Sequence, residues 1–526
     1  MLAATANWFP IVDEREASRE LVDGILENRF TFCAETIALS DGFCWTENPS
    51  KDVEWHILLH KFYYAAGMGR AWQQTGRPQY LYKWLELTSA WMDQTPVDFM
   101  PADVAGRRIQ NWVSAWYYFA GAPMPSAFRL RFLASIEEQA NWLSEHLTPA
   151  RNHRTLELLA LFYAAVAFPE MESAPRWLGI ARQGIVDNLQ ADLRPDGVHC
   201  EQSTDYHHIV LRNALFIRRL AVMNGIPMPD GLDRLLRGAL DFSVHAHRPD
   251  GLIPALSDGD TGSYLGLLQE AYELFGDPSY LWVASQGRQG RPPAERLKAF
   301  PDGGYYFLRS GWGLDEPYKD ERYLVFDCGP LGEGNHGHLD LLSFELYGYG
   351  RPLIVDPGRF TYDESGDVNW RVHFRSTAAH NTVCVDGRNQ TRYEFHKRKF
   401  KVRGPQPAYA LLGFGSRDGY DFVRGRIESQ EYDVVHEREI RMAGGTRFVI
   451  IDELTSANVH SYAQCFQVAP GAEQHVRLID CTSGAACVTE LGWVSAVYGE
   501  KQAAPRIRFV KTGTSVRFET FLEVLA

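Results

Sequence analysis

The hydrophobic pattern changes once along this 526-residue chain, and that change limits the folds the chain can adopt. Up to about residue 285, apolar side chains recur at helical spacing, as in Leu156, Leu159, Tyr163 and Val166. Turns containing Gly and Pro separate these segments. Helical hairpins repeated over most of this length predict a helical toroid or solenoid for residues 1–285.

After Asp302-Gly303-Gly304 the chain carries short runs rich in aromatic and β-branched residues. Tyr323–Asp327 and Phe448–Asp452 are two of these runs, and turn dipeptides such as Asp386-Gly387 lie between them. This pattern predicts an antiparallel β-sandwich for residues 303–526. The polar stretch before it, 286–302, is predicted to be a linker.

Charge and hydropathy exclude several classes of protein. Lys plus Arg number 53 and Asp plus Glu number 66, which gives a net charge of −13. Such a chain is a poor candidate for a general nucleic-acid binder or for a protein of anionic membrane surfaces. The sequence contains no apolar run long enough for a membrane span and no signal-peptide pattern. As read, it predicts a cytoplasmic protein, or a periplasmic or secreted one if a leader has been removed, and it leaves the oligomeric state open.

The densest group of potential ligands is Gly334-Asn-His-Gly-His-Leu-Asp340. In an extended segment His336 and His338 face the same side, and Asp356 and His380 each lie next to a short strand-like run. Two or three histidines with one carboxylate suit Zn²⁺, or Mn²⁺ if oxygen ligands complete the shell. On spacing alone, ordinary polar residues at strand ends are the more common explanation.

Two further polar clusters lie in the helical part. Asn152 and His153 stand at the start of a predicted helix, where a ligand carboxylate would be stabilised. The alternative is an N-cap Asn beside a solvated His. The stretch from Asp196 to His208 includes Tyr206, and it either lines a binding site or forms a helix face that carries Tyr and His.

Arg107, Arg108, Asn111 and Trp112 bring arginine and aromatic side chains together. Aromatic faces stack on sugar rings and Arg pairs with carboxylate or sulfate, so these four are candidate sugar-binding residues. A structural role is the alternative. The basic run His396–Arg403 could face a polyanion, although most charge runs are solvated.

Taken together, these segments resemble the heparinase II/III family of polysaccharide lyases. The stretches that carry the resemblance are NHRTLELLALFYAAVAFPE (152–170), DGVHCEQSTDYHHIVL (196–211), HGHLDLLSFELYGYGRPLIVDPGRFTY (336–362) and FRSTAAHNTVCVDG (374–387). They occur in both predicted domains, and the last two are specific in combination. The resemblance implies an incomplete (α/α) toroid followed by an antiparallel β-sandwich, and cleavage of uronic-acid-containing polysaccharides by β-elimination.

The resemblance also implies roles for individual residues. Four residues match the family's catalytic positions: Asn152, His153, Tyr206 and His336. Three match its metal-binding trio: His338, Asp356 and His380. The implied cofactor is one divalent metal with a structural role, Zn²⁺ first and Mn²⁺ as the alternative. The full predicted substrate-binding set is Arg107, Arg108, Asn111, Trp112, Arg154, His199 and Gln202.

Elimination removes the C5 proton of a uronate and expels the 4-O-linked sugar, so the enzyme must offset the charge of the adjacent carboxylate. Asn152 is predicted to donate a hydrogen bond there, and Tyr206 to transfer the proton. Because a tyrosine pKa is ordinarily about 10, a base role requires neighbours that lower it. His153 is the alternative base for the opposite C5 configuration, and His336 would orient the carboxylate or assist Tyr206.

The predicted substrate is an acidic polysaccharide. A glycosaminoglycan such as heparan sulfate, hyaluronan or chondroitin is the first choice and alginate the second. A glycoside hydrolase is one alternative, and it needs two opposed carboxylates. The candidates for those are Glu201, Asp205, Asp258 and Asp260. A non-catalytic polysaccharide-binding protein is a third possibility.

Overall fold

The computed structural model describes residues 7–396, 399–402 and 404–525. Packing divides the chain into two compact units. The helical unit comprises Met1–Asp192 and Arg212–Asp233, and the sandwich unit comprises Leu193–Leu211 and Arg234–Ala526.

The predicted domain boundary near residue 285 follows the change from helices to strands. The compact units follow packing instead, and they place the helical residues 234–284 with the strands. The domain boundary therefore stays a prediction.

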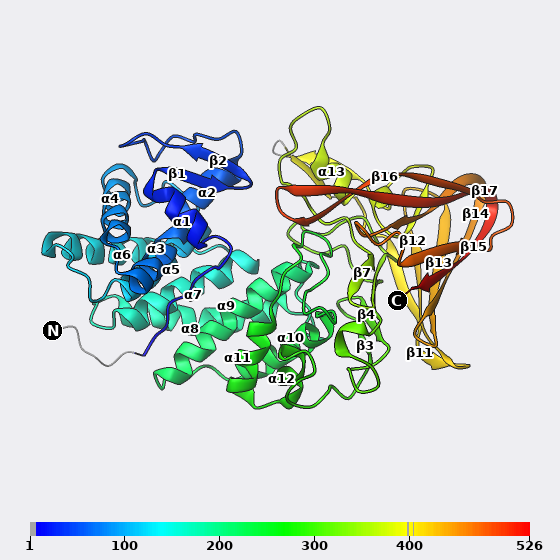
Figure 1. The fold of residues 1–526 in the computed structure, drawn as a ribbon, viewed down its shortest axis with the longest axis horizontal. Coiled ribbons are helices and arrows are strands. Elements are labelled where there is room, and N and C mark those ends of the chain that lie inside the picture. The colour runs from blue at the N-terminus through cyan, green and yellow to red at the C-terminus, as the bar shows by residue number, and fades with distance from the viewer. Residues whose placement is uncertain (1–6, 397–398, 403, 526) are drawn as a thin grey trace. The chain divides into compact units, whose positions relative to one another are not determined.

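The first part of the chain consists mainly of helices joined by short turns (Figure 1). The helices of the helical unit are α1 (Arg19–Leu26), α2 (Val53–Lys61), α3 (Tyr63–Thr75), α4 (Pro78–Gln94), α5 (Ala102–Tyr118), α6 (Ser126–Glu145), α7 (Arg151–Ala167) and α8 (Ala174–Asp192). A small hairpin of β1 (Arg29–Phe32) and β2 (Glu35–Ala38) lies between α1 and α2 in the sequence. Helices α9 (Thr204–Met223) and α10 (Leu232–Ala246) contribute residues to both units. Among the described residues, no helix combines the length and the apolar character that crossing a bilayer requires.

Helices α5 and α7 are buried on all sides over most of their length. Residues 104–116 of α5 and 155–166 of α7 are all buried, which is typical of helices inside a bundle rather than on its surface. Gly106 allows the two helices to approach closely, because a Cβ there would lie only 3.2 Å from the Cα of Glu157. By contrast, the apolar residues that α6 buries form one stripe at intervals of three and four: Phe128, Phe132, Ile136, Ala140 and Leu143.

The sandwich unit contains two large antiparallel sheets. Five strands pair in the order β3-β4-β5-β6-β7, and eight form a second sheet with the order β11-β12-β13-β14-β17-β15, in which β8 pairs with β14 and β16 with β17. The strands are β3 (Leu297–Phe300), β4 (Tyr305–Arg309), β5 (Tyr323–Asp327), β6 (Phe344–Gly348), β7 (Arg351–Ile354), β8 (Val383–Val385), β11 (Ala408–Arg417), β12 (Tyr420–Glu428), β13 (Val434–Ala443), β14 (Arg447–Gln467), β15 (Val476–Asp480), β16 (Ala486–Val497) and β17 (Glu500–Val524). The same unit contains α11 (Leu265–Phe275), α12 (Pro278–Ala284) and α13 (Trp370–Arg375).

The predicted linker and the basic run both contain strands. β3 lies inside the predicted linker 286–302 and pairs with β4, so the end of that stretch belongs to a sheet. β9 (Tyr393–His396) and β10 (Lys399–Val402) form a hairpin, and the basic run begins at the last residue of β9 and includes β10. Lys397, Arg398 and Arg403 of that run lie outside the described residues, and its proposed polyanion role stays a prediction.

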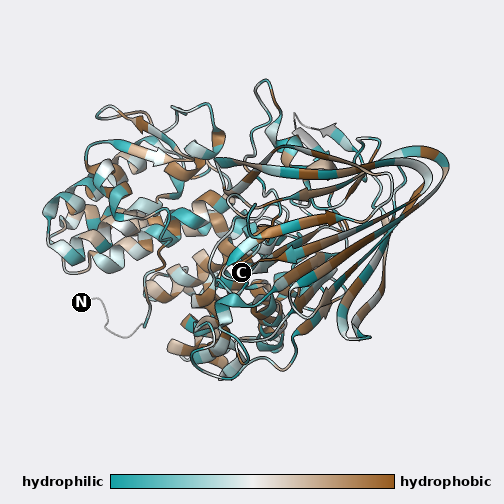
Figure 2. Cartoon of the chain, turned by 45° about the vertical axis from the view of Figure 1, so that its right-hand side comes forward, coloured by the Kyte–Doolittle hydropathy of each residue, from teal (hydrophilic) through white to brown (hydrophobic). Residues whose placement is uncertain are grey.

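The two sheets enclose one hydrophobic core. Strand β12 alternates between buried and more exposed residues along its whole length, and Figure 2 shows bands of opposite hydropathy along the long strands. The eight-stranded sheet therefore packs one face inward while the other meets solvent. In the five-stranded sheet β4 and β6 are buried at every residue, because a second core with Phe242 covers the other face. Both sheets contribute buried side chains to the core, including Leu324, Phe326, Leu346, Ile440, Phe448 and Phe518.

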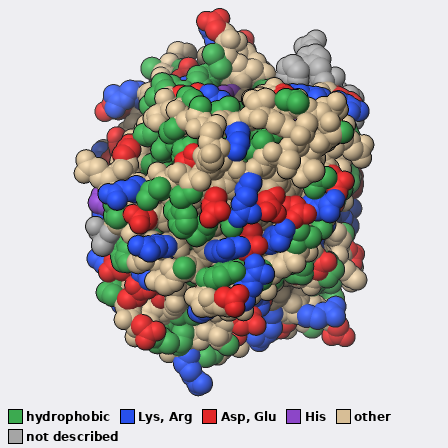
Figure 3. Space-filling view, turned by 90° about the vertical axis from the view of Figure 1, so that its right-hand side faces the viewer, with side chains coloured by type: hydrophobic (Ala, Val, Ile, Leu, Met, Phe, Trp, Pro, Cys, Tyr) green, Lys and Arg blue, Asp and Glu red, His purple; other side chains and the backbone are tan. Residues whose placement is uncertain are grey.

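Charged side chains from neighbouring strands form ion pairs in the eight-stranded sheet. Glu437 and Glu453 stand directly opposite each other on β13 and β14, which alone would be unfavourable. Arg424 lies 2.6 Å from Glu437 and 3.4 Å from Glu453, and Arg517 lies 2.6 Å from Glu453. Figure 3 shows Lys and Arg interspersed with Asp and Glu over the face that it views.

One ion cluster in this sheet predicts a pH-dependent contribution to stability. His460 Nδ1 lies 2.6 Å from Asp386 Oδ2 and its Nε2 lies 2.7 Å from Asp433 Oδ1. Hydrogen bonds to Asp386 and Asp433 raise the pKa of His460, and the hydrogen bond from His460 lowers the pKa of Asp433 to about 2. The histidine contribution is complete below about pH 6.5 and is lost as the pH rises through the raised value. The Asp433 contribution is present above about pH 4 and is lost as the pH falls towards 2.

We therefore expect His460→Gln to lower the melting temperature at pH 5.5 by about 2 °C and to have little effect at pH 9. The shift is small because the pair is screened by solvent. Thermal melts at the two pH values measure it, with His146→Gln, an exposed histidine of α6's C-terminal end, as the control. An equal loss at both pH values would show that His460 acts by packing alone.

Candidate active site

The segment before α9 is shaped by Gln202 and Ser203. Gln202 has a left-handed backbone with φ of 56°, and α9 begins two residues later at Thr204. The Ser203 hydroxyl accepts a hydrogen bond from Tyr206 N at 3.3 Å, as an N-cap side chain does, and it donates to Asp258 O at 3.0 Å. Tyr206 is thereby placed on the first turn of α9 and tied to the loop that carries Asp258.

Tyr206 begins a hydrogen-bonded series of side chains. Its hydroxyl lies 2.8 Å from the Tyr362 hydroxyl, which accepts a hydrogen bond from Arg359 Nη1 at 2.8 Å. Arg359 Nε donates to Asp260 Oδ1 at 3.0 Å. Because a guanidinium can only donate, the Tyr362 oxygen accepts from Arg359, and its own proton can be donated to Tyr206.

Burial determines the protonation of both phenols. It raises the pKa of Tyr206 well above its ordinary value, and the charge of Arg359 offsets only part of that effect. Burial also raises the pKa of Tyr362 to about 12. Both are therefore protonated at neutral pH. The lowered Tyr206 pKa that a base role requires is thus absent here, and Tyr206 is suited to donate a proton instead.

His336 packs against Tyr206 and is oriented by Asp258. The Tyr206 and His336 ring centroids are 4.1 Å apart, and His336 Nδ1 lies 3.0 Å from Asp258 Oδ2. The His336 carbonyl also accepts a hydrogen bond from Asp258 N at 3.0 Å. Because an ionised carboxylate only accepts, Nδ1 carries the proton and Nε2 the lone pair of the neutral ring.

Asp258 is a buried carboxylate shared by several groups. Burial alone would raise its pKa, but the charge of Arg371 and hydrogen bonds from His336 and His338 hold the pKa well below its ordinary value. Arg371 donates to both carboxylate oxygens, with Nη2 at 2.6 Å from Oδ2. His338 Nε2 lies 3.0 Å from Oδ1. One carboxylate therefore orients both a candidate catalytic histidine and a candidate metal ligand.

The predicted metal trio is brought together in the sandwich unit. One potential ligand atom from each of His338, Asp356 and His380 lies within 4.8 Å of the others. His338 Nδ1 is 3.1 Å from His380 Nε2, which is 3.6 Å from Asp356 Oδ2. Asp340 Oδ2, which the sequence did not single out, lies 3.8 Å from the same nitrogen. All four side chains are buried.

The hydrogen bonds around this trio fit a bound cation. His338 Nε2 faces Asp258 and His380 Nδ1 donates to the Ser376 carbonyl at 2.7 Å, so the two nitrogens that face each other carry lone pairs. Burial lowers the pKa of His338 to about 3 and also lowers that of His380. Both rings are therefore neutral at neutral pH, and no proton joins the two facing nitrogens in a hydrogen bond. Asp356 Oδ2 is buried and accepts no hydrogen bond from a described residue. Two imidazoles with outer-shell acceptors and one carboxylate form a ligand set that suits Zn²⁺.

Two sequence profiles match the chain. One, described as Heparinase II/III N-terminus, covers residues 7–281, and the other, described as Heparinase II/III-like, C-terminal, covers residues 292–520. This chain belongs to the heparinase II/III family. The resemblance identified in the sequence is confirmed.

Curated relatives of this heparinase II/III chain include two heparin-sulfate lyases. The protein from Pedobacter heparinus is 26% identical over 381 residues, which are 68% of this chain and 56% of that protein. The protein from Bacteroides thetaiotaomicron is 24% identical over 467 residues, which are 82% of this chain and 64% of that protein. The chain thus spans less than two thirds of the length of either relative.

The crystal structure of heparinase III has the same fold. Its TM-score is 0.84 at 20% identity, over 100% of this chain and 87% of that chain. The predicted fold class, an incomplete (α/α) toroid followed by an antiparallel β-sandwich, is confirmed.

In the helical unit, Asn152 and His153 lie at the start of α7. Asn152 is buried and is the second residue of α7, whose N-cap is Ala150, so the alternative interpretation as an N-cap Asn is wrong. Its carbonyl accepts a hydrogen bond from Thr155 Oγ1 at 2.7 Å. His153 is half exposed, with Nδ1 4.0 Å from Asp103 Oδ1. Arg154 Nη1 donates to the Thr148 carbonyl at 2.8 Å. The catalytic roles of Asn152 and His153 stay predictions.

The structure corrects the predicted sugar-binding role of the cluster on α5. Arg108 and Trp112 are 0% exposed, and Trp112 packs edge-on against Phe62 at 5.4 Å. Arg108 Nε donates to Gln139 at 2.7 Å, and its guanidinium covers the Trp91 ring at 4.0 Å. Both residues are part of the core, and neither can contact a sugar directly.

Their neighbours on α5 are also engaged within the helical unit. Arg107 is buried and donates to Gln110 at 2.8 Å, and Asn111 donates to the Lys61 carbonyl at 2.8 Å. A helix buried on all sides, rather than a sugar-binding surface, explains the mixture of Arg, Asn and Trp.

His199 and Gln202 are likewise structural. His199 is buried, with Nδ1 3.8 Å from Glu201 Oε2. Gln202 is buried, and its carbonyl accepts from the Tyr305 hydroxyl at 2.9 Å. In the amide orientation that satisfies both side-chain atoms, Gln202 donates to Gly303 O at 2.9 Å and accepts from Arg194 Nε at 3.1 Å. Both side chains are engaged locally, and their predicted substrate contacts stay predictions.

Four residues of the site were missed by sequence reasoning: Asp258, Arg359, Tyr362 and Arg371. Arg359 and Tyr362 lie at the end of the 336–362 stretch that carries the family resemblance, so a signal was present there. The sequence offers Asp258 only as a hydrolase carboxylate, and no pattern in it pairs Asp258 with Arg371.

The geometry also argues against the glycoside hydrolase. A hydrolase needs one carboxylic acid that is protonated near neutral pH. Asp258 is held ionised by Arg371, Asp260 is paired with Arg359, and Asp205 accepts from the Tyr264 hydroxyl at 2.5 Å. These three carboxylates position other groups and are poorly placed to act as acids. That leaves Glu201, a buried residue with Oε2 3.8 Å from His199 Nδ1, without the second carboxylate that a hydrolase needs.

Proposed function

We propose that this chain is a polysaccharide lyase that cleaves a uronic-acid-containing glycosaminoglycan by β-elimination to 4,5-unsaturated products. The observation that carries the proposal is the arrangement of Tyr206 between Tyr362 and His336. The heparin-sulfate lyases among the relatives support heparan sulfate as the first substrate, and hyaluronan, chondroitin and alginate follow.

Tyr206 is the proton donor in this proposal. As the C4–O bond breaks, the phenol gives its proton to the leaving sugar oxygen. Tyr362 then donates a hydrogen bond to the phenolate that forms, and Arg359, bonded to the Tyr362 oxygen, strengthens that hydrogen bond.

His336 offers the proton acceptor beside Tyr206. Its Nδ1 proton is directed at the Asp258 carboxylate, which leaves Nε2 to receive the C5 proton. The C5–H and C4–O bonds break and a C4–C5 double bond forms. His336 takes up the C5 proton, Tyr206 gives its proton to the leaving oxygen, and both residues belong to the sandwich unit.

We also propose that His338, Asp356 and His380 hold one divalent metal ion, Zn²⁺ first and Mn²⁺ as the alternative. When bound, the ion would supply a structural cross-link between the segments that carry these ligands. His338 would then keep Asp258, and through it His336, in place.

One assay tests the proposed reaction. The full chain is incubated with heparan sulfate, hyaluronan, chondroitin sulfate and alginate while ultraviolet absorbance of the 4,5-unsaturated product is followed. A rise in absorbance supports the lyase. New reducing ends without absorbance would show hydrolysis, and binding without either signal would show a non-catalytic polysaccharide-binding protein.

Tyr362→Phe tests the supporting role of the second phenol. We expect kcat to fall by about 10- to 100-fold, because the donor to the Tyr206 phenolate is lost, with little change in KM. Tyr349→Phe, at another tyrosine that packs against an arginine, is the control. A Tyr362→Phe variant with full kcat would exclude the proposed hydrogen bond from Tyr362 to the Tyr206 phenolate as a contribution to catalysis.

A further inference from the structure

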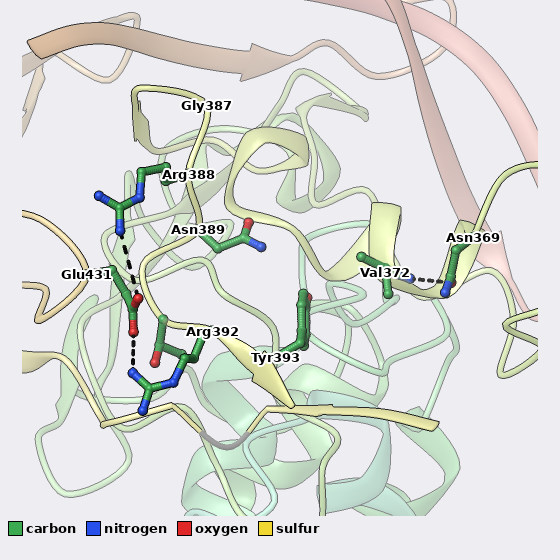
Figure 4. A pocket seen from close by; sticks show the side chains of 9 residues that line it. Asn369, Val372, Gly387, Arg388, Asn389, Arg392, Tyr393 and Glu431 are labelled. Atoms are coloured by element: carbon green, nitrogen blue, oxygen red, sulfur yellow. Dashed lines mark hydrogen bonds and ion pairs between the residues drawn. The ribbon is translucent and has the colours of Figure 1, made fainter. Parts of the chain in front are cut away.

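A cavity lies on the sandwich unit beside α13. Its volume is about 560 Å³, and it is lined by residues of α13, of the turn after β8 and of the chain around Tyr393 (Figure 4). The residues of the candidate active site described above do not line it.

Two asparagines in the lining use their oxygen atoms locally. Asn369 Oδ1 accepts from Val372 N at 3.0 Å, and Asn389 Oδ1 accepts from Thr377 N at 3.0 Å. Their amide NH₂ groups are therefore what these side chains offer to a ligand.

Two arginines flank one carboxylate on the other wall, as Figure 4 shows. Arg392 Nη1 lies 3.0 Å from Glu431 Oε1, and Arg388 Nη2 lies 3.9 Å from Glu431 Oε2. The arginine side chains are 56% and 50% exposed, whereas that of Glu431 is 16% exposed. Arg392 Nε also lies 3.8 Å from Glu394 Oε1, so two cations stand against two carboxylates, and each guanidinium has five N–H donors.

Tyr393 adds an aromatic surface to the lining. The hydroxyl oxygen is buried and has no hydrogen-bond partner among the described residues. The ring lies 5.4 Å from the Arg375 guanidinium. Many N–H donors, two half-exposed guanidinium groups and one aromatic ring suit a sugar unit that carries a carboxylate or a sulfate.

Helix α13 joins this cavity to the active site. Val372 lines the cavity, while Arg371, the preceding residue, donates to Asp258. Arg371 Nη2 also donates to the Asn335 carbonyl at 3.3 Å, and Arg375 Nη2 donates to Asn335 Oδ1 at 3.1 Å. The loop that carries His336 and one wall of the cavity are therefore parts of one hydrogen-bonded structure.

We propose that the cavity lined by Arg388, Arg392, Asn389 and Tyr393 is an accessory subsite that binds an acidic sugar unit of the polysaccharide away from the reacting bond. The inference rests on the proposed function and adds a second point of attachment for the same polymer. A chain held at both points gains affinity with length, so polymers bind more tightly than short oligosaccharides.

The test compares two pairs of arginines that share one geometry. Arg424 and Arg426 flank Glu437 at 2.6 and 3.9 Å, as Arg392 and Arg388 flank Glu431. We expect R388Q/R392Q to raise KM for heparan sulfate polymer about tenfold and to leave kcat/KM for a heparan sulfate tetrasaccharide within about twofold. R424Q/R426Q is expected to match the wild type on both substrates. An unchanged polymer KM, or an equal loss on the tetrasaccharide, would overturn the subsite.

A binding measurement separates this inference from the proposed reaction. Heparan sulfate polymer is titrated calorimetrically into Tyr206→Phe protein with and without R388Q/R392Q, so that turnover does not interfere. We expect about tenfold weaker binding and a shallower salt dependence in the triple variant. Equal affinity, or no binding by either protein, would overturn the subsite. Absence of unsaturated product from wild-type protein would instead refute the lyase.

Discussion

Replacing Tyr206 by phenylalanine is expected to lower kcat by about 10³-fold while the affinity for polysaccharide stays within about threefold of wild type. The substitution removes one oxygen and keeps the ring that packs against His336 at 4.1 Å. Only the proton donor and its hydrogen bond to Tyr362 are lost. The loss should therefore appear in the chemical step and not in binding.

Absorbance of the unsaturated product measures turnover, and calorimetric titration measures binding. Tyr409→Phe, at a partly exposed tyrosine of β11, provides the matched control and should retain full activity. Near-native turnover by Tyr206→Phe would move proton donation to another group. An equal fall in binding and turnover would show that the hydroxyl contributes to substrate binding rather than to proton transfer.

Replacing His380 by alanine is expected to abolish metal binding and to lower the melting temperature by on the order of 5–10 °C. The variant loses the nitrogen that lies 3.1 Å from His338 Nδ1 and 3.6 Å from Asp356 Oδ2. The two remaining ligands stay buried, and a buried carboxylate without its cation is costly. Elemental analysis of purified protein and thermal melts measure the two effects.

A chelator distinguishes loss of metal from loss of packing. Wild-type protein should melt at a lower temperature after chelation and recover when Zn²⁺ is restored, whereas His380→Ala should not respond. His436→Ala removes another buried histidine of the same unit, one that lies 2.6 Å from Asp452, and should remain sensitive to chelation. Metal-free wild-type protein with unchanged melting temperature would exclude a structural ion at this site.

Local patterns predicted a toroid or solenoid of helices followed by an antiparallel β-sandwich, and the family resemblance selected the incomplete (α/α) toroid. The helical spacing of Leu156, Leu159 and Tyr163 reflects the interior position of α7, and the alternation along β12 reflects a sheet with one buried face. His338, Asp356 and His380 were grouped by family resemblance, since their spacing of 18 and 24 residues has no local periodicity. The structure places their ligand atoms within 4.8 Å of one another.

Partnerships between distant residues could not be predicted in this way. Asp258 is 78 residues from His336 and 113 from Arg371 along the chain, and only the fold brings them together. The error on α5 has a related cause. Arg108 and Trp112 have the composition of a sugar site, but a cation stacked on Trp91 inside a bundle has the same composition. Sequence shows which side chains are present, whereas burial decides which of them meet solvent.

The charge of Asp258 is divided between two tasks, because one oxygen faces His336 and the other faces His338. Under the proposed function, a change of the proposed ion or of its ligands would therefore change the charge that Asp258 presents to His336. The proposed metal site and the proposed catalytic histidine are therefore coupled through one carboxylate. A directed-evolution experiment that selects for metal selectivity should then change the catalytic rate along with it.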